Sequence, residues 1–151
     1  MFDLLTPEEH LDIFCDFKGV DSKTKDEEIK KMLIDVDVYH HRNTIAENLS
    51  GGSRRKLSVA IALIGGSKLV LLDEPTSGMD LSARRKLWNM LKNYKTNRII
   101  ILTTHYMDEA DILGDRIGIM TEGRLICLGS SLFLKNRFGV GYNLTMVKKE
   151  K

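Results

Sequence analysis

The sequence has few residues that cross-link or stiffen a fold, since its 151 residues include two cysteines and two prolines. It also has one tryptophan and no glutamine. Cys15 and Cys127 lie far apart and form no CxxC pair, which argues against a disulfide framework or a cysteine zinc site. With 29% charged residues and 12 glycines, the composition is neither disordered nor fibrous. We therefore expect an intracellular, soluble globular protein.

Long hydrophobic runs and an excess of one charge are also missing. No apolar stretch approaches the roughly 18 residues that a membrane helix needs, and Asp3 interrupts any apolar leader at the start. Lys and Arg number 23 against 21 Asp and Glu, a net charge of +2. This balance gives no indication of binding to nucleic acid or to a membrane surface, and the length suits a single domain.

The first forty residues predict two helices. Thr6-Pro7-Glu8-Glu9 has the pattern of a helix start, with Thr6 as N-cap and Glu9 closing a capping box. Gly19 is expected to end this helix, and Thr24 to open the second. Their expected inner faces are Leu11, Phe14 and Phe17 in the first, and Ile29, Met32, Leu33 and Val36 in the second. We interpret both helices as packing elements.

From residue 50 onward, helices alternate with strands. Two apolar runs, Leu69 to Leu72 and Ile99 to Leu102, favour strands buried on both faces, as in parallel sheets covered by helices. Further strands are expected at 116–120 and 125–128, joined by a Glu122-Gly123 turn. Helices are expected from about 51 to 64, at 82–94 and at 107–113. This order predicts an α/β fold with a mostly parallel sheet.

Polar side chains follow both apolar runs. Asp73 and Glu74 come after the first, and Thr103-Thr104-His105 after the second, at the sheet edge where ligands of parallel sheets collect. An ionised carboxylate at a dry edge must be paired, protonated or bound to a cation. We assign Asp73 to a Mg²⁺ ion, through water, and Glu74 to the water that attacks a phosphate. An acidic N-cap of a following turn is the alternative, but it accounts for only one of the two acids.

Three motifs in order resemble the nucleotide-binding domain of ATP-binding cassette (ABC) transporters. The segment Leu49 to Ser58 (LSGGSRRKLS) resembles the signature motif, and Leu71 to Asp80 (LLDEPTSGMD) resembles Walker B running into the D-loop. His105 resembles the switch histidine. Soluble ABC ATPases of DNA repair or translation share these motifs, but the tail from Gly129 through Tyr142 resembles the A subfamily, most closely its first nucleotide-binding domain. The resemblance covers essentially the whole chain.

The resemblance implies a P-loop NTPase (RecA-like) parallel sheet with an α-helical subdomain. The helical subdomain with the signature would span residues 1–66, the catalytic core 67–129 and the tail 130–151. ATP and Mg²⁺ would be the cofactors, and transmembrane domains of a transporter the partners, with this domain on the cytoplasmic face of a membrane. Lipid export is the expectation for the subfamily.

The same resemblance implies roles for individual residues. Ser50, Gly51 and Gly52 would contact the γ-phosphate of ATP held by a second nucleotide-binding domain in a head-to-tail pair, since a glycine-rich helix start offers free N–H groups and a positive dipole end. Asp80 would cross that interface, and His105 would donate to or orient the phosphate. The alternatives are ordinary helix caps for Ser50 and Asp80, and a structural histidine.

The sequence also departs from the family pattern. Ser53 stands where the signature usually has glutamine, and Leu81 where proline often follows the D-loop aspartate. No GxxxxGK[ST] phosphate loop and no Q-loop glutamine occur. We therefore expect the carboxyl-terminal two-thirds of the domain, inactive alone and poorly soluble because the strand of the phosphate loop would be missing from the sheet. A non-catalytic module that completes a partner's ATP site is the alternative function.

Overall fold

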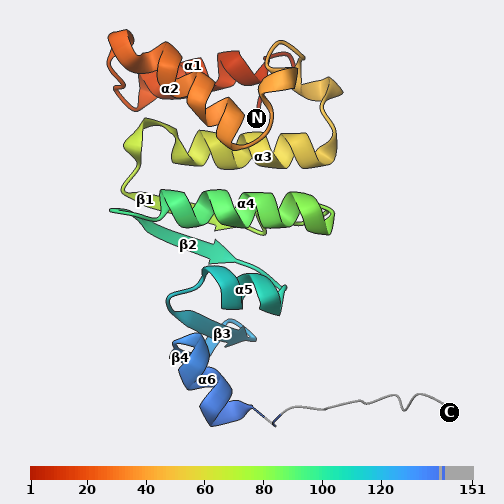
Figure 1. Ribbon diagram of the computed structural model, residues 1–151, viewed down its shortest axis with the longest axis vertical. Helices are drawn as coiled ribbons and strands as arrows, with labels where there is room; N and C mark the ends of the chain where they lie inside the picture. The colour runs from red at the N-terminus through yellow and green to blue at the C-terminus, as the bar shows by residue number, and fades with distance from the viewer. Residues whose placement is uncertain (140, 142–151) are drawn as a thin grey trace, which may run out of the picture. The chain divides into compact units, whose positions relative to one another are not determined.

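The computed structural model describes residues 1–139 and 141, and the chain contacts divide it into two compact units, Met1–Glu109 and Ala110–Lys151 (Figure 1). The first unit contains α1 (Pro7–Phe17), α2 (Ser22–Asp35), α3 (Gly51–Leu63), β1 (Leu69–Asp73), α4 (Leu81–Tyr94) and β2 (Ile99–Thr103), with 3₁₀ turns at Tyr39–His41, Ala46–Asn48 and Ile64–Gly66. Helix α5 (Met107–Leu113) crosses the boundary, and β3 (Ile117–Thr121), β4 (Arg124–Gly129) and α6 (Ser131–Phe138) belong to the second unit. The boundaries expected near residues 66 and 129 stay predictions.

The two helices expected at the start are present. The capping box forms as expected, because Thr6 Oγ1 accepts from the N–H of Glu9 at 3.2 Å and Glu9 Oε2 accepts from the N–H of Thr6 at 2.7 Å. The start predicted for the second helix is wrong by two residues, since Asp21 accepts from the N–H of Lys23 and α2 begins at Ser22. The inner face predicted for α2 is buried, but Phe17 of α1 is 78% exposed and does not join the core.

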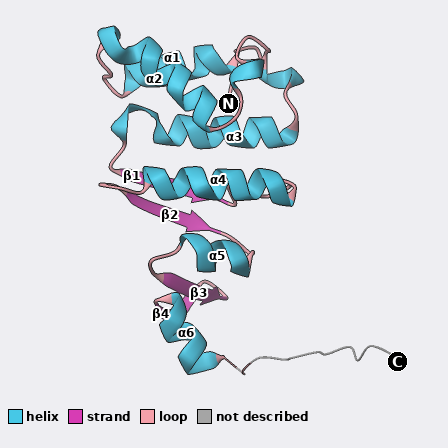
Figure 2. Ribbon diagram, in the orientation of Figure 1, coloured by secondary structure: helices cyan, strands magenta, loops and turns pink. Residues whose placement is uncertain are grey.

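Strands β1 and β2 pair in parallel, with Leu69 opposite Ile99 and Asp73 opposite Thr103 (Figure 2). The prediction that both faces would be buried is wrong for the described residues. Alternate side chains of β1, those of Val70 and Leu72, are buried. The other face is exposed at Leu69, Leu71, Ile99 and Ile101. The described part of the chain therefore supplies helices to one face of a two-stranded sheet and no layer to the other, so poor solubility of the chain alone stays a prediction.

Helix α3 is held firmly at its carboxyl end. The ammonium of Lys18, which follows α1, donates to three carbonyl oxygens at that end, those of Ile61 at 2.8 Å, Ala62 at 3.1 Å and Ile64 at 2.8 Å. Glu28 of α2 accepts from the N–H of Gly65 at 2.7 Å. Carbonyl oxygens in the last turn of a helix lack N–H donors within the helix, so these contacts satisfy groups that would otherwise be unpaired. Burial lowers the pKa of Lys18.

The second unit is a hairpin followed by a helix. Strands β3 and β4 pair antiparallel across Glu122 and Gly123, both of which have positive φ (49° and 72°), as tight hairpin turns require. The mostly parallel pattern predicted for the strands therefore ends at β2. Ser130 caps α6, and Asp111 accepts from Lys135 at 2.7 Å and from Ser131. The predicted resemblance of the tail extends to Tyr142, which lies outside the described residues.

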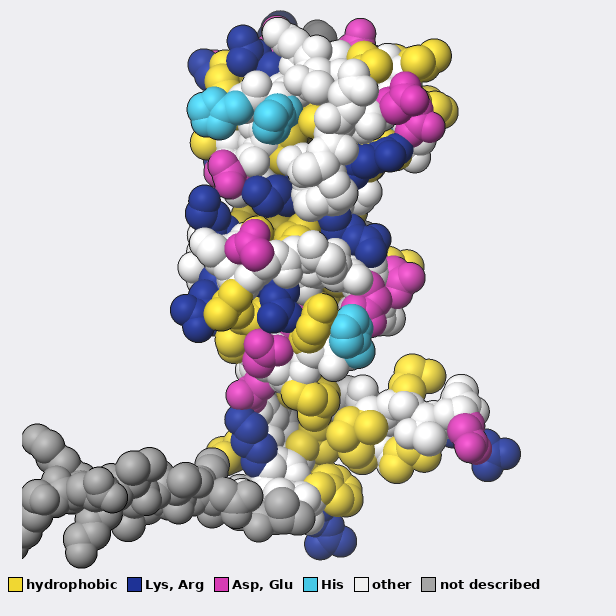
Figure 3. Space-filling model, turned by 90° about the vertical axis from the view of Figure 1, so that its right-hand side faces the viewer, with side chains coloured by type: hydrophobic (Ala, Val, Ile, Leu, Met, Phe, Trp, Pro, Cys, Tyr) yellow, Lys and Arg dark blue, Asp and Glu magenta, His cyan; other side chains and the backbone are white. Residues whose placement is uncertain are grey.

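Hydrophobic side chains reach the surface in both units. Figure 3 shows them in yellow among charged groups, and in the second unit they include Met120, Leu125 and Ile126 of the hairpin. Within residues 1–139 and 141, no helix is both long and apolar enough to cross a bilayer.

The contacts of Lys18 predict a measurable contribution to stability. Lys18→Met keeps most of the aliphatic stem but leaves three half-buried carbonyl oxygens without their donor. We expect it to lower the free energy of unfolding by about 1–3 kcal/mol, the usual cost of unsatisfied buried polar groups. Chemical unfolding followed by circular dichroism measures this loss. Lys23→Met, at an exposed position of α2, is the matched control, and equal losses in the two variants would contradict the role given to Lys18.

Candidate functional site

Two acids and a threonine meet where β1 and β2 end. The parallel register places Asp73 directly opposite Thr103. Thr103 Oγ1 donates to Asp73 Oδ1 at 2.5 Å, and the N–H of Glu74 donates to the carbonyl oxygen of Thr103 at 3.1 Å and to its Oγ1 at 3.2 Å. Thr103 therefore ties both acids to the neighbouring strand. Sequence reasoning placed Thr103 at this edge without a role, although the register of two parallel strands was the signal for it.

Glu74 and His105 are in direct contact. His105 Nδ1 lies 2.7 Å from Glu74 Oε2, with the imidazole 60% and the carboxylate 31% exposed. An ionised carboxylate only accepts hydrogen bonds, so the proton in this contact is on Nδ1 of His105. Glu74 has a φ of +47°, in the left-handed region, which costs a non-glycine residue on the order of 1–3 kcal/mol and is enriched at functional sites. The structure thus brings together Asp73, Glu74 and His105.

Asp73 has the chemistry of a Mg²⁺ ligand. Its side chain is exposed at the end of β1, and Thr103 contacts only one of its two oxygens. Across residues 1–139 and 141, no group of three or more His, Cys, Asp or Glu side chains converges to enclose a metal ion. Magnesium is usually held by one or two carboxylates together with water and substrate phosphates. Asp73 fits that kind of site and does not fit a cage made of protein ligands alone.

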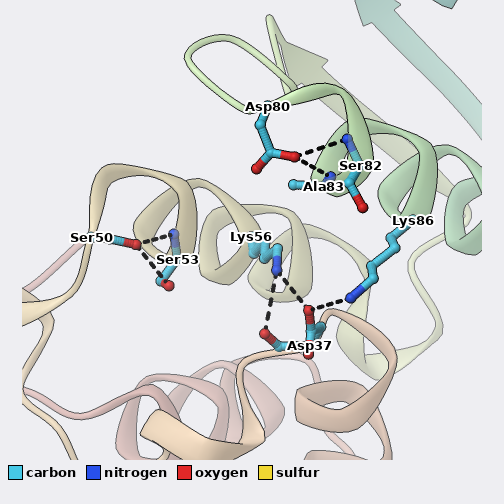
Figure 4. Close-up of polar contacts among 8 residues, drawn as sticks. All are labelled: Asp37, Ser50, Ser53, Lys56, Asp80, Ser82, Ala83 and Lys86. Atoms are coloured by element: carbon cyan, nitrogen blue, oxygen red, sulfur yellow. Dashed lines mark hydrogen bonds and ion pairs between the residues drawn. The ribbon is translucent and has the colours of Figure 1, made fainter.

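The amino end of α3 is capped but otherwise open. Ser50 Oγ accepts from the N–H of Ser53 at 3.2 Å and donates to Ser53 Oγ at 3.0 Å (Figure 4). The N–H groups of Gly51 and Gly52 stand in the first turn, where no acceptor exists within the helix. A Cβ added to either glycine would meet no atom within 4 Å. An ordinary cap therefore explains Ser50, but no contact among the described residues requires the two glycines.

Asp80 caps the next helix, α4. Its Oδ1 accepts from the N–H groups of Ser82 at 2.8 Å and Ala83 at 3.0 Å (Figure 4). These bonds, that of Ala83 first, hold the pKa of Asp80 below its ordinary value of 3.8. The capping alternative is thus observed, and a contact of Asp80 with a partner stays a prediction. In the described part of the chain, no hydrogen bond joins the caps at Ser50 and Asp80 to the acids at the strand ends.

Asp37 is a residue that sequence reasoning missed. It follows α2 in a left-handed conformation, with φ +58°, and contacts Lys56 of α3 at 3.1 Å and Lys86 of α4 at 3.4 Å (Figure 4). The hydrogen bond from Lys56, and then that from Lys86, lowers the pKa of Asp37. One carboxylate therefore links the two helices that begin at Ser50 and Asp80. No sequence pattern indicates this contact, because its three members come from separate elements.

Comparisons with known proteins agree on one family. Residues 1–77 match the family model described as ABC transporter. The chain is 53% identical over 149 residues to the phospholipid-transporting ATPase ABCA3 of Homo sapiens, covering 99% of this chain and 9% of that protein. It is 52% identical over 151 residues to the retinal-specific phospholipid-transporting ATPase ABCA4 of Mus musculus, covering 100% of this chain and 6% of that protein. A solved ATP-binding subunit of an ABC transporter has the same fold, with a TM-score of 0.81 at 23% identity over 93% of this chain and 59% of that one.

The cap at Asp80 predicts a dependence of stability on pH. Because the pKa of Asp80 is lowered in the folded protein, its contribution is complete above the ordinary aspartate pKa and is lost as the pH falls through the lowered value. Asp80→Asn keeps a good capping residue without an ionisable group. We expect the melting temperature of the natural sequence to fall more steeply below pH 3.8 than that of Asp80→Asn. Asp26→Asn controls for the loss of one negative charge, and parallel curves for the natural sequence and Asp80→Asn would contradict the assignment.

Proposed function

Because the chain belongs to the ABC transporter family and has the sequence of an A-subfamily nucleotide-binding domain, we propose that it supplies the Walker B and signature parts of an ATP-hydrolysing site that powers transport. The observation that carries the proposal is the contact of Glu74 with His105 at 2.7 Å, beside Asp73, at the carboxyl ends of two parallel strands. This is the edge where ligands of such sheets bind. ATP is the substrate and Mg²⁺ its companion ion.

The residues at this edge divide the work of phosphoryl transfer. Asp73 holds the Mg²⁺ ion, which neutralises charge on the phosphates when bound. Glu74 orients the attacking water and accepts a hydrogen bond from it, since its carboxylate is half-buried and directed by the left-handed turn. His105 keeps Glu74 in place through Nδ1–H, and its other nitrogen, Nε2, would donate to the phosphate only when the ring carries a second proton, because it is an acceptor in the neutral ring. Thr103 fixes both acids to β2.

The open tip of α3 serves a second nucleotide-binding domain. In a head-to-tail pair, Ser50, Gly51 and Gly52 contact the γ-phosphate of ATP held by the opposite domain, and Asp80 reaches across the same interface. Free N–H groups and the positive end of a helix favour a phosphate at this tip. Support comes from the space around both glycines, where an added Cβ would meet no atom of residues 1–139 and 141 within 4 Å.

The chain spans less than a tenth of the length of the two curated relatives, so its place in a whole transporter is part of the proposal. Both relatives are named phospholipid-transporting ATPases. By that likeness, the domain acts with transmembrane domains, lies on the cytoplasmic face of a membrane and drives the movement of a lipid. Its own charge balance, +2 over 151 residues, supports no role for nucleic acid.

A second candidate function is a non-catalytic module that completes the ATP site of a partner. The observation that favours it is the lack of a GxxxxGK[ST] segment in the 151 residues. The backbone and lysine of such a loop hold the β- and γ-phosphates. These 151 residues by themselves therefore offer Asp73 and Glu74 no such loop, whereas the tip of α3 needs only a nucleotide held by a partner.

The 151-residue chain alone is expected to release no phosphate from ATP. Removing one charge-stabilising group from such a site costs on the order of 10³–10⁵ in rate, and here the whole phosphate cradle is missing. A coupled phosphate-release assay on the purified chain measures this, with Glu74→Gln as the control for contaminating ATPases. Steady turnover that Glu74→Gln abolishes would overturn the expectation.

Pairing with a second domain tests the role of the α3 tip. We expect the chain to bind an A-subfamily nucleotide-binding domain that has its own phosphate loop, and to do so only with ATP. Gly51→Asp should weaken pairing about tenfold or more, because a carboxylate would face the γ-phosphate and like charges in contact cost several kcal/mol. The added side chain has open space, so the fold should be unaffected.

The control for this experiment adds the same charge to the same helix. Ser58→Asp changes an exposed position of α3 away from its tip and should pair like the natural sequence. Analytical ultracentrifugation with and without ATP gives the affinities. Pairing that is independent of ATP, or equally weakened by both variants, would contradict the proposed role.

A further inference from the structure

We propose that Arg84 and Tyr106 are positioning residues that hold the imidazole of His105 against Glu74, and that the buried hydrogen bond between Trp88 and Glu109 anchors them. None of these four residues has a part in the site as described so far. The consequence for hydrolysis rests on the proposed function, but the contacts and the test below do not. All the residues involved belong to the first unit, Met1–Glu109.

The side chain of Arg84 connects α4 to the histidine through a stack of planar groups. The rings of His105 and Tyr106 have centroids 4.0 Å apart, tilted by 39°. The guanidinium carbon of Arg84 lies 4.2 Å from the centroid of the Tyr106 ring and 5.8 Å from that of Trp88. A planar guanidinium stacks on aromatic faces and is attracted by their electrons. The order along the stack is therefore Trp88, Arg84, Tyr106, His105, with Glu74 at its end.

Stacking is what holds Arg84 in this position. Its Nε and one terminal nitrogen are buried, and neither has a hydrogen-bond partner among residues 1–139 and 141. A guanidinium usually satisfies its fixed set of donors with carboxylates or carbonyls. Leaving two of its nitrogens dry and unpaired is unfavourable. The ring contacts must therefore compensate for this cost. They also fix the position of the Tyr106 ring against His105.

The other end of the stack is fixed by a buried acid. Glu109 is fully buried, and its Oε1 accepts from Trp88 Nε1 at 2.8 Å, while Trp88 itself is only 3% exposed. The second oxygen of Glu109, Oε2, is buried without a partner in the described part of the chain. A buried carboxylate is costly, and a leucine would fill the same volume without that cost. We attribute the presence of Glu109 to its hydrogen bond from Trp88 Nε1, which orients the Trp88 ring against Arg84.

This stack matters because His105 is exposed. With 60% of its side chain accessible, the imidazole has room to rotate away from Glu74 or to exchange which nitrogen carries the proton. The Tyr106 ring covers one of its faces, and the N–H of Tyr106 donates to Thr104 Oγ1 at 3.0 Å, which fixes the backbone beside it. The proton on Nδ1 therefore stays directed at Glu74, and Nε2 remains available at the sheet edge.

The test measures the tautomer of His105 directly. The 151-residue chain is labelled with ¹⁵N-histidine and studied at alkaline pH, where a histidine is neutral, in solution or by magic-angle spinning if it self-associates. For the natural sequence we expect the proton of His105 on Nδ1, and nuclear Overhauser contacts linking Arg84 to Tyr106 and Tyr106 to His105. Arg84→Met and Tyr106→Leu should each replace the single tautomer by a mixture. Tyr106→Phe, which keeps the ring, is the matched control and should leave the tautomer unchanged.

Two results would overturn the positioning role. One is an unchanged His105 tautomer in folded Arg84→Met and Tyr106→Leu. The other is the absence of both Overhauser contacts in the natural sequence, a measurement that does not depend on any variant folding. Failure of the pairing or hydrolysis assays would leave these spectra unaffected, so the proposed function and this inference fail separately.

The anchor has its own pair of variants. Glu109→Leu removes the acceptor of the Trp88 indole N–H, whereas Glu109→Gln keeps an amide oxygen that accepts. We expect an upfield shift of the indole proton and mixed His105 tautomers in Glu109→Leu, with both restored in Glu109→Gln. If His105 keeps a single tautomer in Glu109→Leu as well as in Glu109→Gln, then Glu109 has no part in positioning His105.

Discussion

The attachment of the carboxyl end of α3 is the constraint on which the first unit depends. Lys18 and Glu28 come from elements early in the chain, and together they satisfy the last carbonyls of α3 and the amide of Gly65 that follows. Helix α3 is also packed through Leu57 and Ala60 and is joined to Asp37 through Lys56, so the whole helix is held in place. Among the described residues, the Ser50 tip thus combines a fixed position with open surroundings, and the proposed contact with a partner's phosphate would use both properties.

The parallel pairing of β1 and β2 fixes the positions of Asp73 and Glu74. Because side chains alternate along a strand, Asp73 and Glu74 would diverge if β1 simply continued. The register with Thr103 and the left-handed turn at Glu74 redirect both acids to one edge, where Asp73 stays open and Glu74 meets His105. The hydroxyl of Thr103 on β2 thus binds the carboxylate of Asp73 and the backbone N–H of Glu74, and leaves the second oxygen of Asp73 available for the proposed cation.

Much of this architecture could be predicted from local patterns, and the failures have physical causes. Helix starts with strong caps, such as Thr6, and strands with continuous apolar runs were predicted within a residue or two, because the signal is local. The two-sided burial of β1 was wrong, since Leu71 faces a layer that the described residues do not supply. Asp37 and Arg84 could not be found, because each acts through contacts between elements distant in sequence, and no composition or spacing records such contacts.

The hydrogen bond between Trp88 and Glu109 also gives the protein an internal reporter. The sequence contains one tryptophan, so all indole fluorescence of the chain originates at this bond, between α4 and the helix that follows His105. A buried indole emits at shorter wavelengths than a hydrated one. If the binding of a nucleotide or a partner loosens the stack next to His105, the emission maximum of Trp88 will shift. Intrinsic fluorescence therefore reports such a change without a dye or a label.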